Sequence, residues 1–441
     1  MNNNEITKIL SDSILFTSDI NKELFTKKGV KRGLRNDDHS GVLAGLTRIG
    51  DVVGFERQTD GSLKPIPGKL YYRGLDVEEL VKGVQNENRL GFEETIFLLL
   101  SGRLPNKTEL DATQNLIAQT MPLNHRATMN ILARSVLELY VYDENPDDIS
   151  RENLISQSIN LIAKFPTIIA YAYQVLRHDV KGRSLHVRLP YPDKSVAENF
   201  LFMIKGRNNY TELDIKILDL ALILHAEHGG GNNSTFSVRV TSSTETDTYS
   251  AIAAGIGSLK GPLHGGANVK VMGMLADMKE KVSDWTDANQ VDDYLRKVLN
   301  KEVFDRTGLI YGIGHAVYTV SDPRTALLKN MAKDLAKEKG REDEFAFMEL
   351  IEERAIKVFM EAKKSTAKGN VCVNVDFYSG FVYDAIGLPS EVYTPLFAMA
   401  RIVGWSAHRI EEMNFSSKRL IRPAYKNVRE LQDFVALNER K

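Results

Sequence analysis

Helical spacing of apolar residues, from residue 73 almost to the end of the chain, is the feature that most limits the fold. Segment 211–224 is a good example, because Thr211 can cap a helix there. Its apolar residues share one face at helical spacing: Leu213, Ile217, Leu220 and Leu224. Another helix is expected from Thr394, with Pro395 in the tolerated first position. The charged stretch 326–365 is typical of exposed helices. Strand-like runs are few, so the sequence predicts a mainly α protein.

The N-terminal part of the sequence is different in character. Residues 1–43 are polar and mixed, and they predict a solvated arm. From 43 to 72, glycines separate short β-branched or aromatic pieces, which favours a small hairpin region. Breaks rich in glycine or proline near 261–268 and 369–380 suggest a smaller domain inserted into a larger one. We therefore expect an arm at 1–43, a large helical domain from 44–264 and 377–441, and a small domain at 265–376.

Composition argues against several classes of function. The 441 residues carry a formal net charge of -1 with no strongly basic half, which argues against a nucleic-acid partner. The one cysteine, Cys372, rules out an intrachain disulfide and fits a reducing compartment. No apolar run reaches the roughly 18 residues of a membrane span, and the first residues lack the features of a targeting segment. We therefore expect a cytoplasmic protein that binds no membrane.

Three breaks in the C-terminal half carry residues suited to proton transfer. His264 lies in a run of glycine and proline, residues that are unfavourable inside a helix. His315 follows Gly312 and Gly314, and Asp376 precedes the turn at 377–380. Histidine can donate or accept a hydrogen bond near neutral pH, and a carboxylate is a natural base. Spacing alone leaves Asp376 equally open to two roles, a catalytic base or a cap of the following turn.

The stretch 225–234, with His228, Asn232 and Ser234, admits several interpretations. Two histidines three residues apart could bind a metal, but the spacing of a helical zinc site is absent and no cysteine is near. Three consecutive glycines let a ligand approach the backbone, but the ending of a phosphate-binding P-loop is missing. A substrate pocket fits better. We expect no metal and no other cofactor.

Arginines complete the candidate site. Arg324 follows Asp322 and Pro323 just beyond a turn. Arg401, together with Arg419 or Arg422, offers further planar groups that can bind carboxylates. Each arginine alone is more often a surface residue. Taken together with histidines on glycine turns, they favour a site for a dicarboxylate.

These motifs resemble those of a known family, citrate synthase. The runs GPLHGGAN, GIGHAVY followed by DPR, NVDFYSG and AMARIVGWSAH occur in the order and at about the spacing of that family. Weaker similarities to the family lie upstream, in KLYYRGLDVEEL, FEETIFLLLSGRLP and AENFLFMIKG. The resemblance covers roughly residues 44–425. It implies the two-domain helical fold of the family, with the small hairpin region near the N-terminus and the small domain acting as a lid.

The resemblance also implies an activity, the condensation of acetyl-CoA with oxaloacetate and water to citrate and CoA. Asp376 matches the base that removes a methyl proton, His264 the donor to the thioester oxygen, and His315 the group that polarises the oxaloacetate carbonyl. The groups that match oxaloacetate contacts are His228, Asn232, Arg324, Arg401 and Arg422. Arg422 matches a residue supplied by a neighbouring subunit, so a homodimer with shared active sites is implied. Gly312, Gly314 and Asn374 are candidate CoA contacts.

Two departures and three alternatives limit this interpretation. Many relatives have an acidic residue where this chain has Gly229, and Arg-Pro-Arg where it has Arg422-Pro423-Ala424.

The same fold could serve a 2-methylcitrate synthase that uses propionyl-CoA, because one methylene discriminates between the two substrates by only about 1–3 kcal/mol. An acyltransferase acting through Cys372 is a second alternative. A dicarboxylate- or CoA-binding regulator without activity is a third.

Overall fold

The computed structural model describes residues 23, 27–29, 47–121, 132–261, 263–315, 317–362, 371–415 and 420–421. These residues confirm the predicted fold class, since nearly all regular structure is helical. The first group of helices comprises α3 (Val77–Asn86), α4 (Phe92–Ser101), α5 (Lys107–Thr120), α6 (Leu132–Leu139), α7 (Arg151–Lys181), α8 (Val196–Lys205), α9 (Glu212–His225), α10 (Asn233–Ser242) and α11 (Thr248–Leu259). The second comprises α12 (Ala267–Lys281), α13 (Ala288–Leu299), α14 (Pro323–Glu338), α15 (Glu342–Ala362), α16 (Asp376–Ala385) and α17 (Tyr393–Met413).

Local capping explains where the helices begin. The Thr211 hydroxyl accepts a hydrogen bond from the Asp214 backbone N–H, and the Asp214 carboxylate accepts one from the Thr211 N–H. This capping box satisfies two N–H groups at the start of α9 and confirms the predicted helix. Helix α17 begins at Tyr393, one residue earlier than predicted. Pro395 therefore lies within the first turn instead of at its first position, and the first turn needs no N–H from it.

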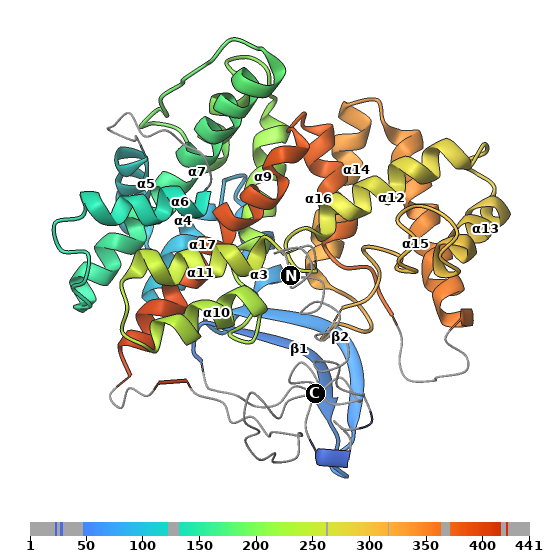
Figure 1. Cartoon of the computed structure of the whole chain (residues 1–441), viewed down its shortest axis with the longest axis horizontal. Helices are drawn as coiled ribbons and strands as arrows, with labels where there is room; N and C mark the ends of the chain where they lie inside the picture. The colour runs from blue at the N-terminus through green and yellow to red at the C-terminus, as the bar shows by residue number, and fades with distance from the viewer. Residues whose placement is uncertain are drawn as a thin grey trace, which may run out of the picture.

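Helix α17 forms the centre of the molecule. It packs against α4, α7, α9, α10 and α11. Figure 1 shows it in red, passing between the helices on the left and α12–α16 on the right. Trp405, Arg401 and Arg409 of α17 are among the largest fully buried side chains. Because a helix that is buried on all sides must satisfy its charges internally, the two arginines need fixed partners.

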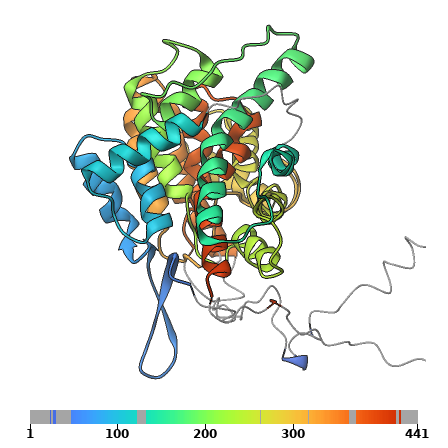
Figure 2. The same ribbon diagram turned by 90° about the vertical axis from the view of Figure 1, so that its left-hand side faces the viewer.

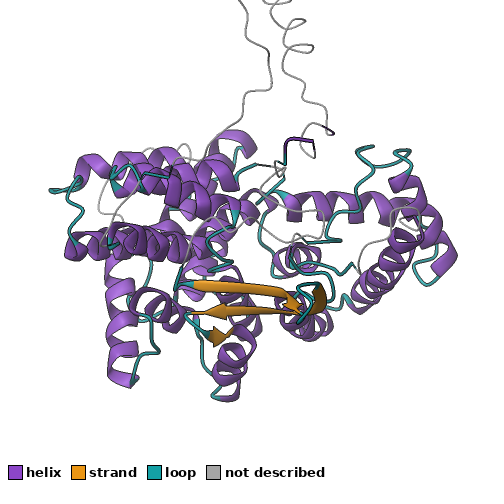
Figure 3. Ribbon diagram, turned by 90° about the horizontal axis from the view of Figure 1, so that it is seen from below, coloured by secondary structure: helices purple, strands orange, loops and turns teal. Residues whose placement is uncertain are grey.

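The predicted hairpin region is an antiparallel sheet of three strands, β1 (Gly50–Arg57), β2 (Leu63–Tyr72) and the short β3 (Leu75–Asp76). Gly50 pairs with Tyr72 and Arg57 with Leu63, and the register shifts between Val53 and Phe55. Figure 3 shows the strands in orange among the purple helices, and Figure 2 shows the hairpin projecting from the body. The base of the hairpin is therefore in contact with the body while its tip extends away.

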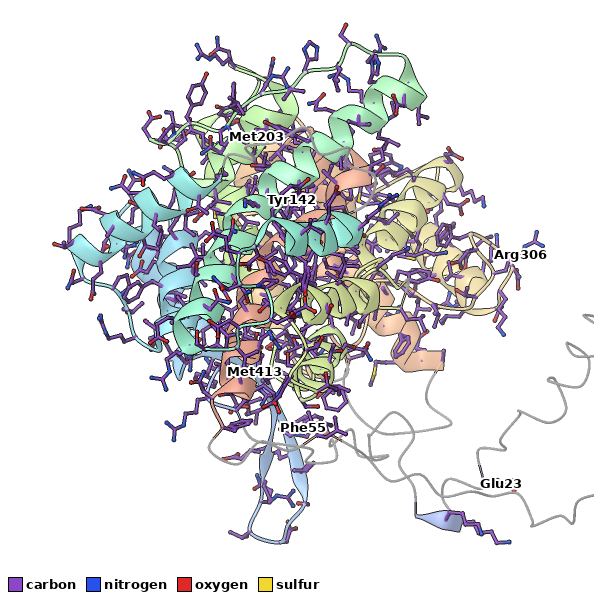
Figure 4. All side chains as sticks on the ribbon, turned by 60° about the vertical axis from the view of Figure 1, so that its left-hand side comes forward. Glu23, Phe55, Tyr142, Met203, Arg306 and Met413 are labelled. Atoms are coloured by element: carbon purple, nitrogen blue, oxygen red, sulfur yellow. The ribbon has the colours of Figure 1, made fainter. Side chains whose placement is uncertain are left out.

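Helices α12–α16 form a second group beside α17. Figure 4 places Arg306, between α13 and α14, at the outer edge of this group. The stretch predicted as exposed helices folds into α14 and α15, but each buries one side, including Leu328 and Leu335 in α14 and Phe345 and Phe347 in α15. The bounds proposed for the small domain, 265–376, stay a prediction.

Helix α7 is the one described helix whose length and apolar composition would allow it to cross a membrane. Over half of its most apolar window, 56%, is buried inside the protein. It packs against α5, α8 and α17, and Lys164 and Pro166 lie within it. These contacts are those of a core helix.

Candidate active site

Asp376 is the first residue of α16 and is half-buried. The segment before it is tied to the turn that carries His315. Ile313 and Val373 form an antiparallel bridge, and the Gly314 N–H donates to the Cys372 carbonyl oxygen at 2.8 Å. Val375 occupies the N-cap position, so Asp376 does not take the capping position that the sequence left open. The two chain breaks thus form one structural unit.

The three candidate CoA contacts have a structural role in that unit. Asn374 donates from its backbone N–H to the Gly312 carbonyl at 2.9 Å, and from Nδ2 to the Gly314 carbonyl at 2.8 Å. Its Oδ1 accepts from the Asp376 N–H at 3.1 Å. Both glycines have positive φ, 81° and 91°, which a residue with a side chain rarely adopts. Their contact with CoA stays a prediction.

His315 has a defined tautomer. Its Nδ1 accepts hydrogen bonds from the backbone N–H groups of Val317 and Tyr318, each at 3.0 Å. Because an acceptor nitrogen carries no proton, the proton of the neutral ring is on Nε2. The Tyr318 ring stacks on the imidazole with centroids 4.5 Å apart and an interplanar angle of 22°. The Nε2–H of His315 is therefore a donor held in a fixed orientation.

His264 is also held in the neutral form. Burial, and then the positive charge of Arg401, lower the pKa of His264 to about 4. Its Nε2 lies 3.0 Å from the Ser234 hydroxyl, which also accepts the Trp405 indole N–H at 3.2 Å. Because the indole can only donate, the single Ser234 proton is left for His264 Nε2 or for Asn232 Oδ1, which is 3.0 Å away. When that proton goes to His264, the imidazole proton is on Nδ1.

His228 lies next to His315. Their ring centroids are 5.1 Å apart, and the Tyr318 ring is 5.6 Å from His228. Burial, followed by Arg324 and His315, keeps the pKa of His228 well below its ordinary value. Its buried Nε2 makes no hydrogen bond among the described residues. A buried polar atom without a partner is costly, so this nitrogen is suited to a ligand.

Two buried arginines complete the site. Arg401 donates from Nε to the His225 carbonyl at 2.7 Å and from Nη1 to Asn232 Oδ1 at 3.1 Å. Its buried Nη2 has no partner within the described part of the chain. Arg324 donates from Nε and Nη2 to the two oxygens of Asp322, at 3.0 and 2.7 Å. Arg401 therefore offers an unused donor, whereas part of the Arg324 fork is already bound by Asp322.

The surroundings of Asp376 make it a weaker acid than a solvent-exposed aspartate. Burial raises the pKa of its carboxyl to about 6, and the charges of Arg324 and Arg401 oppose the increase while Asp322 adds to it. A carboxylate with a pKa nearer neutrality is a stronger base. The carboxyl group of Asp376, two imidazoles and two guanidinium groups are thus close enough to change one another's pKa.

The catalytic and binding roles predicted for these residues stay predictions. Arg422 and its rival Arg419 lie outside the described residues. No group of three or more potential metal-binding side chains occurs in the ranges that the structure describes.

Sequence reasoning missed the buried polar residues that support the site. Glu227 accepts a hydrogen bond from His408 Nε2 at 3.2 Å, and His408 Nδ1 lies 2.8 Å from Arg239 Nη1. Burial opposes ionisation of Glu227, but His408 and Arg401 outweigh it and lower the pKa of Glu227. The available signal was Glu227 itself, a charged residue just after the apolar helix α9, because a charge next to a buried segment needs a buried partner.

Known proteins resemble this chain over most of its length. The family model "Citrate synthase, C-terminal domain" matches residues 38–424. The citrate synthase of Acidithiobacillus ferridurans is 37% identical over 81% of this chain and 88% of its own length. The 2-methylcitrate synthase 1 of Corynebacterium glutamicum is 33% identical over 93% and 98% of the two chains.

A solved structure also matches. The citrate synthase of the archaeon Thermoplasma acidophilum, in complex with carboxymethyl coenzyme A and oxaloacetate, superposes with a TM-score of 0.71 and 26% identity. The match covers 90% of this chain and 97% of that one. The resemblance seen in the sequence is thereby confirmed: the chain belongs to the citrate synthase family of acyl-transferring enzymes.

Proposed function

We propose that this protein condenses acetyl-CoA with oxaloacetate and water to give citrate and free CoA. The observation that carries the proposal is the pairing of the chain segments before His315 and Asp376, with His228 beside His315 and an unused donor on the buried Arg401. The chemistry uses the side chains of the protein and its two substrates, with no metal or other cofactor. A cytoplasmic location fits these substrates.

In the first step, the Asp376 carboxylate removes a proton from the methyl group of acetyl-CoA. The methyl group is a very weak acid, so the negative charge that develops on the thioester oxygen needs a donor. His264 supplies it from Nδ1 when the Ser234 hydroxyl donates to Nε2. One preorganised donor of this kind can be worth about 3–4 kcal/mol. Because His264 is neutral, it stabilises the developing charge by donating a hydrogen bond and contributes no full positive charge.

In the second step, the methyl carbon attacks the oxaloacetate carbonyl carbon. The Nε2–H of His315 donates a hydrogen bond to the carbonyl oxygen and stabilises the negative charge that develops there as the new carbon–carbon bond forms. The resulting alkoxide takes up a proton, formally the one that Asp376 removed from the methyl group, so that both side chains return to their starting protonation states. Arg401 and Arg324 bind the carboxylates, and the unpaired Nε2 of His228 contributes a further contact. Water then hydrolyses the thioester bond of the condensed intermediate, so that citrate and CoA leave.

Closure and assembly belong to the same proposal. An enolate would be protonated by bulk water, so the site must close during the reaction. The segment 265–376 is the proposed lid, and two copies of the chain share their active sites, with Arg422 reaching the neighbouring site. Gly312, Gly314 and Asn374 contribute to binding CoA.

The second candidate function is the synthesis of 2-methylcitrate from propionyl-CoA. It is favoured by the similarity to the 2-methylcitrate synthase of Corynebacterium glutamicum at 33% identity. The two reactions use the same catalytic positions, and one methylene in an apolar pocket changes the barrier by only about 1–3 kcal/mol. We prefer acetyl-CoA as the substrate.

A thiol-release assay with purified protein tests the proposal. We expect release of CoA that depends on both oxaloacetate and acetyl-CoA, with a higher kcat/KM for acetyl-CoA than for propionyl-CoA. A large preference for propionyl-CoA would replace the first function by the second. Binding of oxaloacetate without release of thiol from either substrate would indicate a regulator.

The pH dependence of the reaction should follow Asp376. The base must be ionised, and its pKa is raised to about 6. We therefore expect kcat/KM for acetyl-CoA to fall with decreasing pH. Below about pH 6, log(kcat/KM) should fall by about one for each pH unit. Stopped assays across a series of buffers of equal ionic strength measure this profile, and circular dichroism at each pH excludes unfolding. A rate that stays constant down to about pH 4.5 would contradict the assignment.

Replacing Cys372 with serine should leave the rate near normal. The thiol is buried, and burial raises its pKa to about 12, so almost no reactive thiolate forms at neutral pH. Its S–H group donates to the Tyr318 carbonyl at 3.6 Å, which a serine hydroxyl can also do. Loss of thiol release in a folded Cys372→Ser protein would instead support transfer of the acyl group through this residue.

A further inference from the structure

The base of the β1–β2 hairpin lies directly on the segment between His315 and Arg324. The Gly68 N–H donates to the Ser321 carbonyl oxygen at 3.0 Å, and Ser321 Oγ is 3.3 Å from the same nitrogen. Gly54 and Gly68 are buried, although most residues around them in the strands are exposed or half-buried. Figure 4 places Phe55, the neighbour of Gly54, where the hairpin leaves the body.

These two positions have no space for a side chain. A Cβ atom added to Gly54 would lie 2.2 Å from the Val317 carbonyl oxygen, and one added to Gly68 would lie 2.2 Å from the Ser321 carbonyl oxygen. Neither atom is the end of a flexible side chain, so the backbone itself would have to move. Gly54 lies where the register shifts, between Val53 and Phe55. Glycine inside a strand often marks the close approach of another backbone.

The contact reaches His315 through Tyr318. An added Cβ at Gly68 would also lie 2.4 Å from Cδ1 of the Tyr318 ring. That ring stacks on His315 and meets the edge of His228. The backbone N–H groups of Val317 and Tyr318, which fix the His315 tautomer, belong to the same segment. The hairpin thus contacts the Tyr318 ring, and that ring contacts the His315 imidazole.

The hairpin also touches the other histidine loop. An added Cβ at Gly50 would lie 2.9 Å from Cγ of Glu227, and one at Gly229, whose φ is 81°, would lie 3.2 Å from Val52. His228 stands between Glu227 and Gly229 in the sequence. One strand pair therefore supports the backbone on both sides of the proposed oxaloacetate site.

We propose that the β1–β2 hairpin is a positioning element of the active site. The backbone of Gly54 and Gly68 packs directly against segment 317–321 and thereby orients Tyr318 and His315. This inference rests on the proposed function, because it assigns the hairpin an effect on the group that polarises the oxaloacetate carbonyl. The hairpin residues themselves touch neither substrate nor reacting atoms. Their effect is on the direction of the His315 Nε2–H.

The test compares two glycine-to-alanine variants. Gly68→Ala displaces Tyr318, whereas Gly83→Ala is a matched control, because an added Cβ on that helical glycine meets nothing within 4 Å. We expect Gly68→Ala to lower kcat by about 10- to 100-fold, the effect of a small misplacement of a reacting group. The KM for oxaloacetate should change by a smaller factor than kcat. Equal kcat values for the two variants would overturn the inference.

A spectroscopic readout separates orientation from general damage. A strong hydrogen bond to the carbonyl lowers its stretching frequency, so the difference infrared spectrum of oxaloacetate labelled with carbon-13 at the keto position reports on His315. The band of the bound ligand should move toward that of free oxaloacetate in Gly68→Ala and stay in place in Gly83→Ala. An unchanged band in a folded Gly68→Ala protein would contradict the positioning role.

Tyr318 provides a second pair of variants in case Gly68→Ala does not fold. Tyr318→Leu removes the ring between the hairpin and His315 and should reproduce the loss of kcat and the shift of the band. Tyr318→Phe keeps the ring that stacks on His315, so the infrared band of the bound ligand should stay at its wild-type position. Equal band positions in the two variants would also overturn the inference.

The outcomes for the inference and for the proposed function are distinct. If the wild-type protein binds oxaloacetate but releases no CoA, the proposed function fails, and the infrared comparison still decides whether the hairpin orients His315. If the wild type is active and the variants behave like their controls, only the inference fails. If the wild type does not bind oxaloacetate, both are wrong.

Discussion

Replacing Asp376 with asparagine should remove nearly all CoA release and leave oxaloacetate binding intact. The amide has almost the shape of the carboxylate but cannot accept the methyl proton, and a general base contributes about 10²- to 10⁴-fold to a rate. The backbone N–H of residue 376 and its bond to Asn374 are unaffected by the change. Thiol release measures the loss of turnover, and calorimetry measures the affinity for oxaloacetate. Full activity of the variant would show that another group is the base.

The same substitution should stabilise the empty protein at alkaline pH. Because the folded-state pKa of about 6 lies above the ordinary 3.8, ionisation of Asp376 destabilises the folded state. This penalty is absent below the ordinary pKa and complete once the pH exceeds the folded-state value. The variant should therefore gain up to about 3 kcal/mol in unfolding free energy at about pH 8 and little at about pH 4. Denaturant titrations at both pH values check this, and an equal effect at both would contradict it.

The mainly helical class, the helices at 211–224 and after Thr394, and the hairpin were predictable because their signals are local. Thr211 and the apolar stripe after it define α9 without reference to distant residues. The glycine breaks around His264 and His315 indicated the candidate site for the same reason, since glycine and proline act on the backbone where they occur. Family resemblance then supplied the roles of these residues, which their spacing alone left open.

Contacts between distant segments were not predictable from the sequence. In the sequence, Gly54 and Gly68 indicate only breaks between the strand-like pieces of a hairpin. The structure shows that the 317–321 backbone packs against them. Asn374 was a candidate CoA contact, yet its side chain bonds to the Gly314 carbonyl sixty residues away. Each of these interactions depends on which segments meet in space, and local propensity carries no information about that.

Arg401 should be the binding residue least tolerant of change, even to lysine. Its guanidinium uses Nε and Nη1 on His225 and Asn232 and keeps the buried Nη2 for a ligand. A lysine retains the charge opposite Glu227, so most of the stability should survive, but it cannot reproduce three donors in a planar arrangement. Losing a buried charge-assisted contact to a ligand costs about 2–5 kcal/mol. We therefore expect Arg401→Lys to weaken oxaloacetate binding by at least about 30-fold.

The matched control is Arg409→Lys on the same helix. Arg409 is also buried in α17 and also has a donor, Nη1, without a partner among the described residues, but its Nε donates to Thr248 Oγ1 of α11 at 3.1 Å. Its replacement should lower the stability as much as that of Arg401 and leave oxaloacetate affinity unchanged. Calorimetry and denaturant unfolding of both variants separate binding from folding. If both lose affinity to the same degree, damage to α17 is the cause, and Arg401 has no direct role in holding the dicarboxylate. If neither does, the carboxylates are held by other groups.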